Sequence, residues 1–255
     1  MAKSKIKGRF LYLSLALAKA RFKERNEGSY LGIFWYLLNP LFMFILLLLI
    51  FSDRLGREIP LYPLYLLVGI IIFNLFQKAT VESTKVIREN SWFIKSINFP
   101  RETLIGSIVL KTLFSHIFEI ILFMVFLSIF KAPLTGIIFY PFILVFFCVF
   151  IYGISLILSS ITVYLIDLDN IWAFVSRLIW LGTPIFYSIG GQTRLFYVNL
   201  FNPIYYFITI TREIIIYGKT PQAWMILGAI GYSLLFFIIG IFIFNRLKTK
   251  FAELI

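Results

Sequence analysis

The stretch IFWYLLNPLFMFILLLLIFS, residues 33–52, decides the fold. It contains no charged side chain, and almost every residue is apolar. An α-helix needs about 20 mostly apolar residues to cross the hydrocarbon core of a bilayer. The sequence therefore predicts a transmembrane helix here.

Five further segments meet the same criterion. Hydrophobic residues make up 60% of the chain and charged residues 14%, whereas soluble domains have about 45–50% and about 25%. A soluble fold of this size could not bury that much apolar surface. We therefore expect an all-α integral membrane protein with one transmembrane domain, 1–255, and about six spans, the later five being 61–80, 103–130, 135–165, 171–187 and 223–244.

The net charge of +12 lies mostly between the apolar runs. Such a pattern indicates topology and contact with anionic lipid rather than nucleic-acid binding. If the N-terminus is cytoplasmic, sixteen Lys and Arg residues fall on that side and six on the other. Because Lys and Arg accumulate in cytoplasmic loops, both termini are predicted to be cytoplasmic.

Residues 8–28 precede the first span and read as an amphipathic helix at the membrane interface. Phe10, Leu13 and Leu17 share one helical face, and Ser14 falls on another. Basic residues beside an apolar stripe are typical of helices that lie along a membrane surface. A solvated basic tail is the alternative.

Two connections are longer than turns. The first, 82–102, mixes charges with Trp92 and Phe93 and is expected to form a short amphipathic helix ending before Pro100, where a soluble partner could bind. The second, 188–220, is too apolar for a free loop. We expect it to form helices that re-enter the outer leaflet, with a bend at Asn202-Pro203.

The sequence lacks the residues of an enzyme. Gly218-Lys219-Thr220 resembles the end of a phosphate-binding loop, but Glu213 stands where the first glycine is required. His116 is the only histidine, which excludes a two-histidine zinc motif. We therefore expect no catalytic residue, metal or cofactor in this chain, and energy supplied by a partner or an ion gradient.

Charged residues inside spans are costly and mark candidate functional positions. Lys111 and Glu119 share one face of the third predicted span, and Arg177 lies in the fifth. By helical rise, Lys111 and Arg177 reach similar depths, so they are candidates to receive an anionic, phosphate-bearing lipid. The alternative is that both cations extend to head groups. Glu119 and His116 could hydrogen-bond or relay a proton.

Aromatic residues cluster at the start of the first span. Trp35, Tyr36 and Phe42 could line a channel, because the faces of sugar rings are apolar and slide over aromatic rings. An ordinary interfacial aromatic belt is the alternative reading.

The order of several short motifs resembles the type 2 ABC exporter permeases, and within them the polysaccharide and O-antigen exporter (Wzm-like) group. The motifs are Ser29-Tyr30-Leu31-Gly32 with Trp35 and Asn39-Pro40, Asn98-Phe99-Pro100-Arg101-Glu102, Asp167-Leu168-Asp169, Thr183-Pro184-Ile185-Phe186-Tyr187, Phe201-Asn202-Pro203 and Phe251-Ala252-Glu253. One position departs from the pattern: Ile166 stands where Arg often precedes the acidic turn.

The resemblance implies a homodimer in the cytoplasmic (inner) membrane with two copies of a separate ABC ATPase, which would use ATP and Mg. The implied substrate is a polysaccharide on a polyprenyl pyrophosphate carrier. Three sets of residues are implied: ATPase contacts at Arg88, Glu89, Trp92, Phe93, Lys95, Asp167 and Asp169; a channel at Trp35, Tyr36, Phe42, Phe186 and Tyr187; and a lipid-pyrophosphate entrance at Arg21, Arg25, Lys111 and Arg177.

Other functions fit the same composition. The same class of permease also exports teichoic acid, capsule, drugs and other small molecules. An ion-coupled secondary transporter is a second class, although no clear repeat relates the two halves of this chain.

Overall fold

The computed structural model describes residues 2–27, 30–56, 58–97 and 99–254, with side chains described from residue 10 onward except residue 252. Gly28 of the expected interface helix, and Ser29 and Asn98 of the compared motifs, lie outside the described residues. The described chain is helical and contains no strand.

Five helices are long and apolar enough to cross a membrane. They are α2 (Trp35–Leu55), α3 (Tyr62–Glu89), α5 (Glu102–Ile129), α6 (Tyr140–Tyr164) and α10 (Ala223–Leu247). Short 3-10 turns, Gly32–Phe34 and Thr135–Phe139, precede α2 and α6. These helices confirm the expected all-α, multi-pass membrane protein.

The remaining elements are shorter or lie across the bundle. They are α1 (Ala2–Asn26), α4 (Ser91–Ser96), α7 (Leu168–Gly182), α8 (Thr193–Leu200), α9 (Pro203–Thr211), the π-helical turn η3 (Arg212–Ile216), η4 (Lys248–Lys250) and α11 (Phe251–Leu254).

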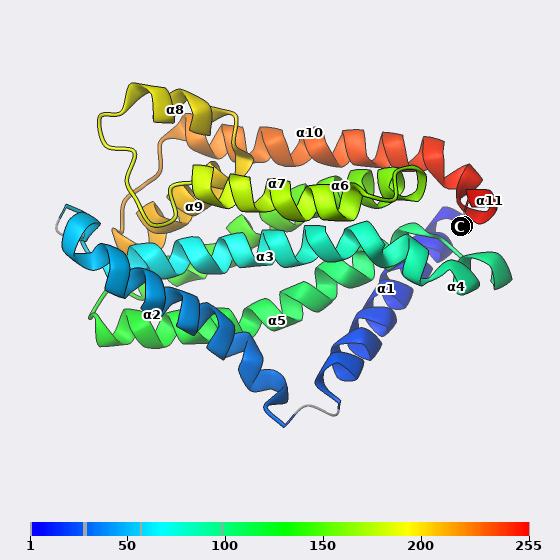
Figure 1. The fold of residues 1–255 in the computed structure, drawn as a ribbon, viewed down its shortest axis with the longest axis horizontal. Coiled ribbons are helices and arrows are strands. Elements are labelled where there is room, and N and C mark those ends of the chain that lie inside the picture. The colour runs from blue at the N-terminus through cyan, green and yellow to red at the C-terminus, as the bar shows by residue number, and fades with distance from the viewer. Residues whose placement is uncertain (1, 28–29, 57, 98, 255) are drawn as a thin grey trace.

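The long helices run side by side, with α3 inside the bundle (Figure 1). Of the apolar window of α3, 72% is buried, against 17–50% for the other four long helices. The short elements gather at two opposite ends: α4 and α11 at one, called the α4 end, and α8 and α9 at the other, called the α8 end (Figure 1). Helix α3 packs against α2, α5, α6, α7 and α9, whereas α10 packs on α6 and α1 packs on α5.

Helices α6 and α10 approach each other closely at two glycines. A Cβ added at Gly240 would lie 2.4 Å from the carbonyl oxygen of Gly153, and one added at Gly153 would lie 2.5 Å from the backbone of Phe236. Only glycine allows the two backbones to approach this closely, as small residues do in other membrane helix pairs.

Two expected boundaries are wrong. The helix of the second predicted span does not end at residue 80: α3 continues to Glu89 and carries Lys85 and Arg88 on a helix. The fifth segment ends at Gly182, not 187, because Pro184 cannot donate a helical hydrogen bond. The 15 residues of α7 span about 22 Å, short of the hydrocarbon thickness, so the six-span count stays a prediction.

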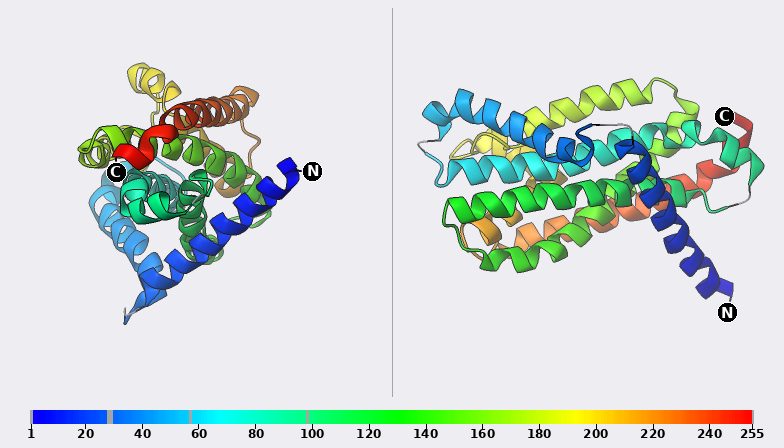
Figure 2. Two further views of the ribbon diagram at one scale, coloured as in Figure 1. Left: turned by 90° about the vertical axis from the view of Figure 1, so that its right-hand side faces the viewer. Right: turned by 90° about the horizontal axis from the view of Figure 1, so that it is seen from below.

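The expected interface helix is α1, which runs across the bundle instead of along it (Figure 2). It contacts α5 through Ser14 and Ala18, which are buried. Ser14 was expected on a different helical face from Phe10; both side chains lie next to Gly106 of α5, so that assignment is wrong. A Cβ on Gly106 of α5 would lie 3.0 Å from the Ser14 hydroxyl, so the small pair is what brings the two helices together.

The bend expected at Asn202-Pro203 is confirmed. The Asn202 side chain accepts a hydrogen bond from the Ile204 backbone N–H at 3.1 Å and so caps α9. Pro203 occupies the first turn, where a missing N–H costs nothing. Helix α9 is buried in the bundle; its re-entry into a leaflet stays a prediction.

Candidate functional site

A basic groove opens between α3 and α7 with a cavity volume of about 450 Å³. We define the basic groove by its lining residues: Arg25, Gln77, Lys78, Val81, Glu82, Lys85, Ala173, Ser176 and Arg177. Four cations and one carboxylate therefore line it, so the groove favours an anion.

Helical spacing produces this lining. Gln77, Val81 and Lys85 lie one turn apart along α3 and so share one face. Ser176 of α7 accepts a hydrogen bond from the Gln77 amide at 3.3 Å, which holds the floor of the groove. Toward the α4 end, Arg88 and Asp169 close it with an ion pair of 3.1 Å.

The cations of the groove differ in their partners. Lys78 pairs with buried Glu119 at 2.7 Å, and Glu82 accepts from Lys111 of α5. Within the part of the chain that the structure describes, Arg25, Lys85 and Arg177 have no acidic partner. These three exposed cations give the groove its unbalanced positive charge.

The expected lipid-pyrophosphate entrance is partly assembled. Arg25 and Arg177 come together in the basic groove, although about 150 residues separate them in sequence. Lys111 does not line the groove; it is 4% exposed and reaches the groove only through Glu82. Arg21 lies nearer the α4 end, where it donates to the Asn90 side chain at 3.1 Å.

At the α4 end, five of the expected ATPase contacts are exposed: Glu89, Trp92, Phe93, Lys95 and Asp167. Trp92 is 68% exposed, and its ring lies 5.2 Å from that of Phe93. On the other side of α4, Ile94 is buried in a hydrophobic cluster with Phe251. Helix α4 is therefore anchored on one side and presents two aromatic rings on the other. The remaining two expected contacts, Arg88 and Asp169, pair with each other.

The five expected channel aromatics do not share one cavity in this chain. Trp35 and Phe42 lie on the exposed side of α2. Tyr36 is buried instead, stacked on Phe22 at 5.6 Å and on Phe118 at 6.0 Å.

The other two channel candidates lie at the α8 end. Phe186 stacks on Phe51 of α2 at 4.9 Å. Tyr187 donates to the Gly182 carbonyl at 2.8 Å, and burial raises the pKa of its hydroxyl.

Arg212 is a residue that the sequence reasoning did not single out. It is 3% exposed and lies over the Tyr65 ring at 3.3 Å. Its guanidinium donates to the carbonyls of Tyr65, Pro184 and Ile185 at 2.7–3.1 Å. The available signal was a single arginine inside the apolar stretch 204–217. Arg212 thus ties η3 to α3 and to the segment after α7.

Among the described residues, no group of three or more His, Cys, Asp or Glu could hold a metal ion. Glu213, next to Arg212, keeps one buried carboxylate oxygen without a hydrogen bond, and burial raises its pKa more than Lys219 lowers it.

Comparison with known proteins agrees with this architecture. The chain is similar to two proteins named O-antigen export system permease protein RfbA: one from Klebsiella pneumoniae, 27% identical over 95% of both chains, and one from Myxococcus xanthus, 23% identical over 94% of both. The profile of the ABC-2 type transporter family matches residues 12–216. Because this profile covers well over half of its length, the chain belongs to the ABC-2 type transporter family.

Proposed function

We propose that this chain is the permease subunit of an ATP-driven exporter that moves a lipid-linked polysaccharide, O-antigen or a similar cell-surface glycan, out of the cytoplasm. The names of its relatives and its family membership support the substrate class and the ATP-driven mechanism. ATP would be hydrolysed by a separate ABC ATPase, two copies of which would serve a homodimer of this chain in the inner membrane.

The observation that carries the proposal is the basic groove. Pyrophosphate bears several negative charges, and Arg25, Lys85 and Arg177 are cations without acidic partners in the described chain. Guanidinium groups bind phosphate oxygens in a fork geometry. The carrier's pyrophosphate would bind in the groove while its polyprenyl tail stays in lipid beside α7, whose Phe174 and Leu178 are exposed.

The α4 end is the proposed contact with the ATPase. Trp92 and Phe93 are large, exposed and held in place by buried Ile94, which is how aromatic anchors of interfaces are built. This assignment places the α4 end, α1 and both termini in the cytoplasm, in agreement with the positive-inside rule. Movement of the ATPase dimer would then be passed through α4 to α3.

Export assays test the groove. In cells that depend on this permease, Arg177→Gln should lower surface glycan by about tenfold, since a charge-assisted hydrogen bond contributes about 1.5–3 kcal/mol and each 1.4 kcal/mol is a factor of ten. Arg194→Gln removes an exposed arginine at the α8 end and should leave export unchanged. Equal export by both variants would contradict the proposal.

Two further measurements separate the rivals. Trp92→Ala should abolish copurification of the ATPase, whereas Trp224→Ala, which alters a partly exposed tryptophan at the start of α10, should not. Transport that persists without nucleotide, under an ion gradient alone, would favour a secondary transporter instead.

A further inference from the structure

A chain of hydrogen bonds leads from the basic groove into the bundle. Lys78 Nζ of α3 lies 2.7 Å from Glu119 Oε1 of α5. Glu119 Oε2 lies 2.9 Å from His116 Nδ1. His116 Nε2 lies 2.6 Å from the Tyr140 hydroxyl at the start of α6. Each of these side chains is therefore partnered, and together they connect three helices.

A donor and an acceptor can be assigned consistently to each hydrogen bond among these four side chains. An ionised Glu119 only accepts hydrogen bonds, so His116 donates to it through Nδ1–H; with a neutral imidazole, Nε2 accepts from the Tyr140 O–H. A neutral imidazole meets both requirements. The chain then holds one positive charge, on Lys78, and one negative charge, on Glu119.

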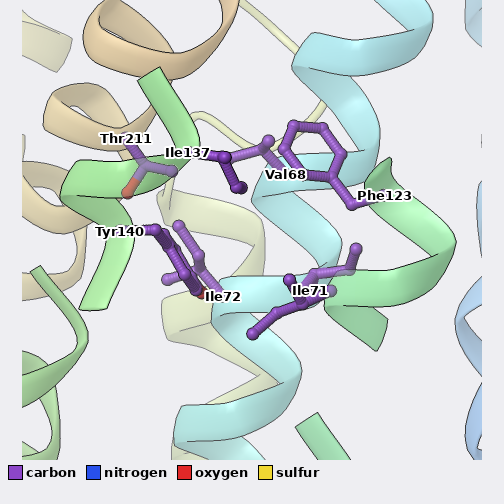
Figure 3. Close-up of a pocket in the computed structure, with 8 residues that line it drawn as sticks. Val68, Ile71, Ile72, Phe123, Ile137, Tyr140 and Thr211 are labelled. Atoms are coloured by element: carbon purple, nitrogen blue, oxygen red, sulfur yellow. The ribbon is translucent and has the colours of Figure 1, made fainter. Parts of the chain in front are cut away.

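The inner end of the chain is closed. Tyr140 lines an apolar cavity of about 10 Å³ together with Val68, Ile72 and Phe123, and Figure 3 shows these side chains around it. That volume is at the lower limit for a single water molecule, and apolar walls offer a water few partners. The chain of hydrogen bonds can therefore affect the groove, but it does not continue beyond Tyr140 as a water-filled path.

Lys78 differs from its partner in exposure. Its side chain is 26% exposed and lines the basic groove, whereas Glu119 is 1% exposed. The neighbouring pair has the opposite arrangement, with Glu82 in the groove and Lys111 buried. Lysine has a flexible stem and a point charge, so its ammonium can turn between two acceptors.

We propose that Lys78 is a cation shared between Glu119 and the anionic phosphate groups that enter the basic groove, with Glu119 acting as a positioning residue that sets the affinity of the groove. The inference rests on the proposed function of the groove. An arriving pyrophosphate competes with Glu119 for Lys78. His116 keeps its hydrogen bond to the carboxylate, so Glu119 is not left without a donor, and it reclaims Lys78 when the anion leaves.

Besides Lys78 and Lys85 of α3, cations of three neighbouring helices lie near this exchange. Lys111 faces the site from α5, but Glu82 neutralises it. Arg25 reaches the groove from α1, and Arg177 from α7. These two cations attract the anion without belonging to the chain, so the effect of Glu119 on binding passes through Lys78.

Binding of farnesyl pyrophosphate, a short polyprenyl pyrophosphate, to the full chain in lipid nanodiscs tests the inference. Glu119→Gln should lower the Kd by about tenfold, because it removes the competitor for Lys78. Lys78→Gln should raise the Kd. The double variant should bind like Lys78→Gln alone, since Glu119 acts only through Lys78. Glu213→Gln makes the same charge change at the α8 end and should leave the Kd unchanged.

The outcomes separate the two proposals. Absence of farnesyl pyrophosphate binding by the unaltered protein would overturn both the groove and the exchange. Binding that Glu119→Gln leaves unchanged would overturn the exchange alone. If Glu119→Gln also lowers the Kd in the Lys78→Gln background, Glu119 acts through a general charge effect. That outcome would also overturn the exchange. If Glu119→Gln does not fold, Glu119→Asp, which draws the carboxylate back by one methylene, should tighten binding in the same direction.

Discussion

The side chain of Arg212 holds several segments together at the α8 end. It donates to backbone carbonyls of two segments, and a Cβ on Gly69 would lie 2.8 Å from its Nη2 atom. A guanidinium that replaces several missing backbone partners at once rigidifies the irregular chain around it.

Replacing Arg212 should therefore destabilise the protein. In Arg212→Met, the Ile185 carbonyl loses its Arg212 donor and the Pro184 carbonyl keeps only a long bond of 3.4 Å from the Tyr65 hydroxyl, at about 1–3 kcal/mol for a buried acceptor left unpaired. We expect a clear fall in the midpoint of thermal unfolding in detergent. Arg194→Met, at an exposed position, is the control, and an equal midpoint in both variants would contradict the structural role of Arg212.

Some residues of the basic groove could be predicted from the sequence, and others could not. Arg25 and Arg177 could be selected because charges near or inside apolar segments are conspicuous. Lys78 was not selected, although the predicted second span, 61–80, contains it, because it lies close to the expected end of that span, where a cation is ordinary. Its pairing with Glu119 depends on the register between α3 and α5, which no local pattern in the sequence contains.

At the scale of elements, the crossing of α6 and α10 depends on Gly153 and Gly240. Gly240→Leu should push the two helices apart, since even a Cβ at Gly240 would lie 2.4 Å from the Gly153 carbonyl oxygen. The expected result is a lower unfolding midpoint. Gly231→Leu, on the same helix but with nothing within 4 Å of an added Cβ, should be tolerated. A midpoint that is unchanged by Gly240→Leu would contradict the packing described.

The hydrophobic pattern predicted the ends of helices correctly only where the composition of the sequence changes abruptly. The start of α10 at Ala223 was predicted correctly because polar residues precede it. The end of α7 was not, because residues 183–187 are as apolar as the helix before them and only Pro184 marks the stop. The helix α3 was predicted too short because its last turns carry charges on one face, the face that forms the groove.

At the scale of the whole molecule, the C-terminal segment holds α4 in position. Phe251 is fully buried and packs with Ile94 of α4 and Phe244 of α10. The Arg101 guanidinium donates to the Lys248 carbonyl, and Lys248 pairs with Glu102. Residues 94–102 and residues 244–251 thus meet at the surface that we propose as the ATPase contact.

Loosening this segment should loosen α4 alone. Phe251→Ala removes a buried ring, a change that costs about 3–5 kcal/mol in a well-packed core. Hydrogen exchange of residues 91–96 should become faster, while α9 stays protected. Leu254→Ala, at a position that is 50% exposed, is the matched control. Unchanged exchange in α4 would show that Phe251 does not support it.

The continuity of α3 has a consequence for how this protein can evolve. One uninterrupted helix carries the Tyr65 carbonyl that accepts from Arg212, two of the four groove cations (Lys78 and Lys85) and, at its last residue, the junction with α4. Adding a single amino acid halfway along would turn everything beyond it by about 100°. We therefore expect insertions to be tolerated in the loops of this protein, whereas α3 should change only by substitution.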